Sequence, residues 1–120
     1  MQTVNNQAQL NKQLQEFTGT EQYYRHLTGY LFTDGVHFLA QEYGTFWLID
    51  EILIANQPPL DEEFQVWKLQ RVFNTDTFKL ICEDGNKNCV YTKEIPFSDF
   101  SADKVELWFA NNVLYLPSEH

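Results

Sequence analysis

Residues 64–95, FQVWKLQRVFNTDTFKLICEDGNKNCVYTKEI, decide the fold. Short runs rich in β-branched and aromatic residues are separated by NTD and by EDGNKN, which are typical of turns. Runs joined by connections this short predict antiparallel hairpins. VELWF (105–109) and VLYL (113–116) have the same composition and are separated by Asn111-Asn112. The sequence therefore predicts an antiparallel meander of strands between residues 64 and 116.

The first residues predict a helix that is only loosely packed. Leu10, Leu14 and Phe17 lie at steps of four and three, which places them on one stripe, while Gln, Asn and Lys residues occupy the other faces. We therefore expect a helix over about residues 5–17. It lies in an N-terminal segment, 1–18, that contacts the rest of the domain by one edge.

A second helix is predicted over about residues 45–56. FWLIDEILIAN is apolar nearly all round, which is typical of a buried helix, and Thr45 before it is a suitable N-cap. QPPLDEE (57–63) then predicts a turn and not a domain boundary, because neither half is large enough to form a core alone. We predict an α+β fold, a single domain of residues 1–120 whose antiparallel sheet is covered on one face by helices.

The region between these helices is compatible with two structures. EQYYRH (21–26) predicts a short strand. In YLFTDGVHFL (30–39), Asp34-Gly35 between two apolar runs favours a two-residue hairpin turn. The helix formers of VHFLAQEY (36–43) favour a helix instead. We expect the hairpin, while the helix remains the alternative.

Charge and composition exclude several classes of function. Eight Lys and Arg face seventeen Asp and Glu, giving a net charge of −9, and no basic stripe is present. Direct binding to nucleic acid or to an anionic membrane is therefore not expected. Acidity favours solubility, or docking on a basic partner. No apolar segment is long enough to span a bilayer and the N-terminus does not resemble a signal peptide, so we expect a cytoplasmic protein.

Sequence motifs for common catalytic and cofactor sites are absent. The chain has no glycine-rich phosphate loop, no nucleophile elbow and no H-E-x-x-H. We therefore expect no cofactor and no metal. Cys82 and Cys89 are expected to be free thiols in a reducing compartment, although a hairpin would also allow them to bridge on oxidation. The tail LYLPSEH, which ends in His120, is expected to be frayed.

One group of side chains within residues 17–39 is compatible with catalysis. The group comprises Arg25, His26, Asp34 and His37, joined by Asp50 or Glu51 from the following helix. Two imidazoles and a carboxylate can shuttle a proton or hold a metal. The spacing matches no metal motif, and a hairpin would place His37 opposite Phe32, away from His26. The structural alternative is that Asp34 makes the turn while His26 and Arg25 pair with carboxylates or backbone carbonyls.

Several motifs occur in order along the chain: FTGTEQYYRH, TDGVHFLA, FWLIDEI, FQVWKL, CEDGN and LPSE. In this combination the chain resembles a family of small uncharacterised bacterial proteins, found in cyanobacteria and in gene sets carried by plasmids or phages. The resemblance covers nearly the whole chain. It implies no activity, cofactor or catalytic residue, and an accessory or anti-defence role follows from it only by analogy.

We predict a non-enzymatic protein-binding module. Tyr, Trp and Arg dominate binding hot spots, so the candidate anchors are Tyr23, Tyr24, Arg25, Trp67 and Trp108. The two tryptophans lie in predicted strands and are also candidates for the core. The partner would be another protein, or a second copy of the chain. The alternative function is a small enzyme or ligand-binding domain, which would need a concave pocket joining Arg25, His26, Asp34 and His37.

Overall fold

The computed structural model describes residues 6–57, 60 and 62–120. The helices are α1 (Gln7–Gln15), α2 (Asp34–Tyr43), α3 (Phe46–Ala55) and a 3₁₀ helix, η1 (Pro117–Glu119). The strands are β1 (Tyr23–Arg25), β2 (Leu31–Thr33), β3 (Phe64–Arg71), β4 (Phe78–Glu83), β5 (Cys89–Ile95), β6 (Lys104–Ala110) and β7 (Val113–Tyr115). The fold is α+β, as predicted. Where the predictions for segments 1–18 and 57–63 concern residues 1–5, 58–59 and 61, they lie outside the described residues.

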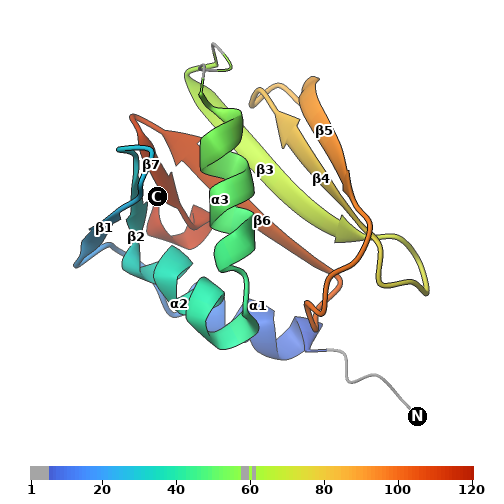
Figure 1. Cartoon of the computed structure of the whole chain (residues 1–120). Coiled ribbons are helices and arrows are strands. Elements are labelled where there is room, and N and C mark those ends of the chain that lie inside the picture. The colour runs from blue at the N-terminus through green and yellow to red at the C-terminus, as the bar shows by residue number, and fades with distance from the viewer. Residues whose placement is uncertain (1–5, 58–59, 61) are drawn as a thin grey trace.

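All seven strands belong to one sheet, in the order β1-β2-β7-β6-β3-β4-β5 (Figure 1). β3, β4 and β5 form the predicted antiparallel meander, and β6 and β7 form a hairpin. The meander does not continue from β5 to β6, because β6 pairs with the other side of β3. β2 and β7 pair in parallel, with Leu31 opposite Val113, so the sheet is mixed. A strand from the first third of the chain therefore lies beside one from its last ten residues.

The hydrophobic core lies between the sheet and the helices α2 and α3. α3 crosses the front of the sheet in Figure 1. Alternate residues of β3, namely Gln65, Trp67 and Leu69, are buried on this inner face. A buried amide pair ties it to the end of α3, because Gln65 Nε2 donates to Asn56 Oδ1 at 2.8 Å. The intervening residues of the strands point to the opposite, outer face.

The predicted hairpin turn at Asp34-Gly35 is wrong, since these residues begin α2. Thr33 is the N-cap, and its hydroxyl accepts a hydrogen bond from the Val36 N–H at 3.3 Å. An acidic residue in the first helical turn is favourable, which explains Asp34 there. The hairpin instead joins β1 to β2, with Tyr24 opposite Phe32. His37 therefore lies on a helix and not across a hairpin from Phe32.

α3 begins after Thr45, as predicted, but it is not buried all round. Its inward side buries Leu48, Ile49, Ile52 and Leu53. Phe46 and Ile54, by contrast, are exposed. Thr45 occupies the N-cap position, yet its side chain makes no capping hydrogen bond.

The tail was expected to be frayed, but it forms β7 and η1. β7 and η1 follow each other, and the Ser118 hydroxyl donates to the Leu14 carbonyl at 2.9 Å. The His120 ring lies 5.3 Å from the Trp108 ring and 5.9 Å from the Tyr115 ring. Contacts with residues distant in sequence thus hold a segment whose composition suggests a loose end.

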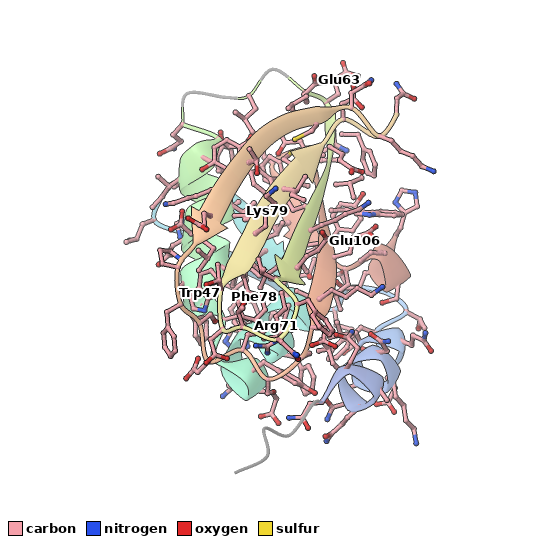
Figure 2. The ribbon with its side chains drawn as sticks, turned by 90° about the vertical axis from the view of Figure 1, so that its right-hand side faces the viewer. Trp47, Glu63, Arg71, Phe78, Lys79 and Glu106 are labelled. Atoms are coloured by element: carbon pink, nitrogen blue, oxygen red, sulfur yellow. The ribbon has the colours of Figure 1, made fainter. Side chains whose placement is uncertain are left out.

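Arg71 fixes the far end of β3. Its guanidinium lies 4.6 Å from the centroid of the Phe78 ring (Figure 2). It donates to the Phe100 carbonyl at 2.6 Å and to the Asp103 carboxylate at 3.2 Å. The Arg71 guanidinium therefore makes its contacts within the fold, and it joins the β3–β4 turn to the segment before β6.

Candidate functional site

The loop between β1 and β2, residues 26–30, is organised around the His26 imidazole. Its Nδ1 accepts a hydrogen bond from the Thr28 backbone N–H at 3.1 Å and lies 2.9 Å from the Thr28 hydroxyl. Since a backbone N–H can only donate, Nδ1 is the unprotonated nitrogen and Nε2 carries the proton. Nε2 therefore donates to Asp50 Oδ1 on α3, at 2.7 Å. The prediction that His26 pairs with a carboxylate is confirmed.

Two further hydrogen bonds hold this loop against the end of α3. The Gln57 side chain donates to the Thr28 carbonyl at 2.9 Å, and the Tyr30 hydroxyl donates to the Asn56 carbonyl at 2.9 Å. Within the loop, Arg25 Nη1 donates to the Gly29 carbonyl at 3.3 Å, which confirms a backbone partner for Arg25. The loop thus has a defined conformation before any partner binds.

Exposed apolar side chains surround the His26–Asp50 contact. Leu27, next to His26, is fully exposed. Phe46 and Ile54 are 48% and 57% exposed, and they lie four residues before and after Asp50, so they share one side of α3. We call Leu27, Phe46, Asp50 and Ile54 the loop–helix surface. It combines apolar contact area with a carboxylate that is itself exposed.

Next to this surface, His37 packs as an aromatic ring. It stacks on Tyr24 with ring centroids 4.2 Å apart and planes 6° apart. It also meets the Phe46 ring edge-on, with centroids 5.8 Å apart. His37 therefore connects β1 to the start of α3 by ring contacts.

Asp34 meets a residue that the sequence reasoning missed, Glu119. The half-buried Glu119 carboxylate accepts hydrogen bonds from the Thr33 hydroxyl at 2.7 Å and from the Leu116 N–H at 2.9 Å. Burial raises the pKa of Glu119, and a hydrogen bond with the Asp34 carboxyl acts in the same direction, whereas Thr33 opposes it. This carboxyl pair lies at the start of α2, beside the first turn of the helix.

The predicted catalytic group is not brought together by these contacts. His26 pairs with Asp50, His37 stacks on Tyr24, and Asp34 meets Glu119. Hollows of about 250 and 190 Å³ lie beside α1, and none of Arg25, His26, Asp34 and His37 lines either of them. Among the described residues, no cluster of three or more His, Cys, Asp and Glu side chains is placed to hold a metal ion.

A model of one protein family matches residues 8–120. The chain belongs to the family of unknown function DUF6876. The expectation of an uncharacterised family is confirmed. No curated protein and no solved structure matches this DUF6876 chain. None of the described helices combines the length and the apolar character that crossing a membrane requires.

The predicted binding anchors of the DUF6876 chain lie in three different places. Tyr23 and Arg25 are exposed on the edge strand β1, whereas Tyr24 is half-buried against His37. Trp67 is 1% exposed and belongs to the core, so it offers no surface to a partner. Trp108 is half-buried on the outer face, where its indole N–H donates to Glu106 at 2.7 Å.

The two cysteines of the DUF6876 chain are free and differ in environment. Cys82 is buried and lies opposite Tyr91, whereas Cys89 is exposed and lies opposite Glu83. Burial is the main cause that raises the pKa of Cys82 to about 12. Because the thiolate is the reactive form, burial and a raised pKa make Cys82 less reactive than an exposed thiol with an ordinary pKa.

Sequence reasoning did not select Leu27 and Ile54 as site residues. Ile54 lies in a helix that is apolar on nearly every side, so sequence does not tell which side meets solvent. Leu27 lies between two turn residues, His26 and Thr28, and an isolated leucine there is an ordinary core candidate. The only signal in the sequence for the solvent side of this helix was the polar edge formed by Asp50 and Glu51.

Proposed function

We propose that this DUF6876 chain is a non-enzymatic protein-binding module whose loop–helix surface docks an apolar segment of another protein. The observation that carries the proposal is Leu27. Its side chain is fully exposed on a loop that three hydrogen bonds hold against α3. Because the loop is already held in place, its backbone loses little conformational entropy when Leu27 binds a partner.

The charge around the surface specifies the partner further. Asp50 lies between Phe46 and Ile54 on α3, with its side chain 59% exposed, and the whole chain carries a net charge of −9. A partner segment with Lys or Arg beside apolar side chains complements both features. We therefore commit to a basic, apolar segment as the occupant.

The setting of this interaction is part of the same proposal. A bacterial cytoplasm agrees with two free cysteines and with the sequence resemblance to plasmid- and phage-borne proteins. An accessory role for a mobile element, including one against host defence, needs a specific protein target. A docking module supplies that, since it works by occupying a surface.

Site-specific photo-cross-linking tests the proposal. A photoreactive phenylalanine analogue replaces Leu27 in living cells, and the same analogue replaces Phe73, which is highly exposed on the β3–β4 turn, as the control. We expect a partner cross-linked from position 27 and not from position 73. Peptide mapping should place the cross-link in an apolar segment with Lys or Arg nearby.

The captured partner is then purified and its affinity is measured by calorimetry. We expect Leu27→Ser and Ile54→Ser each to weaken binding by about tenfold or more, which corresponds to about 1.4 kcal/mol. Phe73→Ser removes a comparably exposed side chain and should leave the affinity unchanged. Equal binding by all variants, or cross-links from position 73 alone, would refute the loop–helix surface as the docking site.

A further inference from the structure

The outer face of the sheet differs in charge from the rest of the molecule. Residues paired across strands share a face, so the register assigns three lysines and three glutamates to the outer face of β3–β6: Lys68, Lys79, Lys104, Glu83, Glu94 and Glu106. Figure 2 labels Lys79 and Glu106. The whole net charge of −9 therefore lies elsewhere in the chain. Two copies can approach through this face with the least mutual repulsion.

The same face also carries a cluster of half-buried rings. The Phe64 and Trp108 rings are 5.2 Å apart, and the Trp108 and Tyr115 rings are 6.1 Å apart, each pair in an edge-on arrangement. Val66 and Ile81 lie on the same face and are also only partly buried. These side chains keep part of their apolar surface exposed on the outer face, and a partner could cover it.

The register between β3 and β6 gives this face a particular pattern. Opposite each other stand Lys68 and Glu106, Val66 and Trp108, Phe64 and Ala110, and Gln70 and Lys104. The first pair places a positive beside a negative side chain, although within the chain Lys68 Nζ lies 3.1 Å from Glu83 Oε1 on β4. The second and third each join a large side chain to a smaller one. Three of these four outer positions on β3, namely Phe64, Val66 and Lys68, are thus complementary in charge or size to their neighbours on β6.

We infer that the outer face is a homodimer interface, with a two-fold axis that runs parallel to the strands between β3 and β6. Rotation about this axis places β6 of one copy over β3 of the other and keeps every cross-strand row in line. Lys68 then faces Glu106 of the second copy, and Glu106 faces its Lys68. Large rings likewise meet smaller side chains, because Trp108 faces Val66 of the second copy.

This arrangement is an isologous interface between two aligned sheets, and both features are common in proteins. α2 and α3 lie on the inner face, so the loop–helix surface of each copy stays outside the interface. A dimer would therefore present two docking surfaces at once. The interface is inferred from the register, charge balance and rings of the outer face, and it does not depend on the proposed function.

Charge reversal followed by analytical ultracentrifugation tests the dimer. We expect wild-type protein to show a concentration-dependent monomer–dimer equilibrium. Glu106→Lys and Lys68→Glu each bring like charges together at both symmetric contacts, so each should weaken dimerisation by tenfold or more. A mixture of the two variants should form heterodimers, because opposite charges then meet across both contacts. In the heterodimer each chain still carries like charges at positions 68 and 106. The recovered association must therefore come from contacts between the two chains.

Two more variants complete the design. Val66→Lys should also give monomers, and it removes neither partner of the hydrogen bond between Glu106 and Trp108. Glu42→Lys makes the same charge change as Glu106→Lys at an exposed position on α2, and it should not weaken the dimer. Thermal unfolding of dilute samples confirms that each variant folds. A wild type that stays monomeric at every concentration would overturn the inference. So would a dimer that survives Glu106→Lys and Val66→Lys, or single variants that do not associate when mixed.

Discussion

Glu119 shows how one residue late in the sequence can shape a helix near the start. Its carboxylate accepts hydrogen bonds from the Thr33 hydroxyl and the Leu116 N–H. It also contacts the Asp34 carboxyl at the first turn of α2. A buried carboxyl next to another carboxyl holds its proton more tightly than one in water. Glu119 therefore links the stability of the fold to pH.

The sign of that linkage gives a first prediction. The pKa of folded Glu119 is raised above its ordinary value of 4.5, so the folded protein binds this proton more tightly than the unfolded chain does. Its contribution to stability is full below pH 4.5 and is lost as the pH rises through the raised pKa. We expect Glu119→Gln to abolish this fall, as measured by urea unfolding at a series of pH values.

Glu16→Gln, at the exposed C-cap of α1, serves as the control for that series and should follow the wild type. If the Glu119→Gln and wild-type curves stay parallel over the whole range, the proton on Glu119 does not contribute to stability.

For single side chains, the sequence indicated some contact partners and missed others. The structural alternative paired His26 with a carboxylate or a backbone carbonyl. Asp50 was already among the side chains expected near it, because a helix was predicted over 45–56. The partner of Asp34 could not be found in the same way. Glu119 lies 85 positions further on in the numbering of the chain, and no periodicity relates the two.

Among the elements, the two N-caps at Thr33 and Thr45 differ in how their hydroxyls are used. The Thr33 hydroxyl accepts from the Val36 N–H and donates to Glu119. The Thr45 hydroxyl is buried, and it has no hydrogen-bond partner within the described part of the chain. An N-cap hydroxyl that accepts a hydrogen bond stabilises the helix, whereas a buried hydroxyl without a partner lowers the stability of the fold.

The same substitution at both caps gives a matched prediction. Thr33→Val should lower the free energy of unfolding by about 1–2 kcal/mol, because it removes the cap and the donor to Glu119. Thr45→Val should leave stability unchanged or raise it by up to about 1 kcal/mol. Both variants are compared with the wild type by urea denaturation at one pH. Equal losses at the two sites would show that the Thr45 hydroxyl is satisfied in solution.

The elements differ in how far sequence could predict them. Strands β3 to β6 and helix α3 were predicted because each carries its pattern within its own residues. The error at Asp34-Gly35 arose because a turn signal and a helix start use the same residue types. The deciding contacts come from Thr33 and Glu119. The parallel pairing of β2 with β7 has no local signal, since it joins segments about 80 residues apart.

Across the whole molecule, the excess of negative charge is distributed unevenly. The outer face of β3–β6 is balanced, so the net charge of −9 is concentrated on the remaining surface. Like charges brought together by folding repel each other and lower stability. Dissolved salt screens that repulsion, with a Debye length that falls from about 30 Å at 0.01 M to about 3 Å at 1 M.

We therefore expect the Tm to rise by several degrees when salt is raised over that range, measured by calorimetry on dilute protein. A variant that neutralises exposed acids, Glu16→Gln with Glu42→Gln and Asp99→Asn, should start at a higher Tm in low salt and depend less on salt. A Tm that falls with salt would mean that ion pairs such as Lys93–Glu51 outweigh the repulsion.

The parallel pair of β2 and β7 also has a consequence for synthesis in the cell. The β1–β2 hairpin has only three residues in each strand, and its neighbour in the sheet is β7, which the ribosome makes about 80 residues later. Isolated hairpins this short are not stable in water. The nascent N-terminal third, with its exposed rings, must therefore wait for residues 113–119 to leave the ribosome. During that interval it is a natural substrate for the chaperones that bind emerging chains.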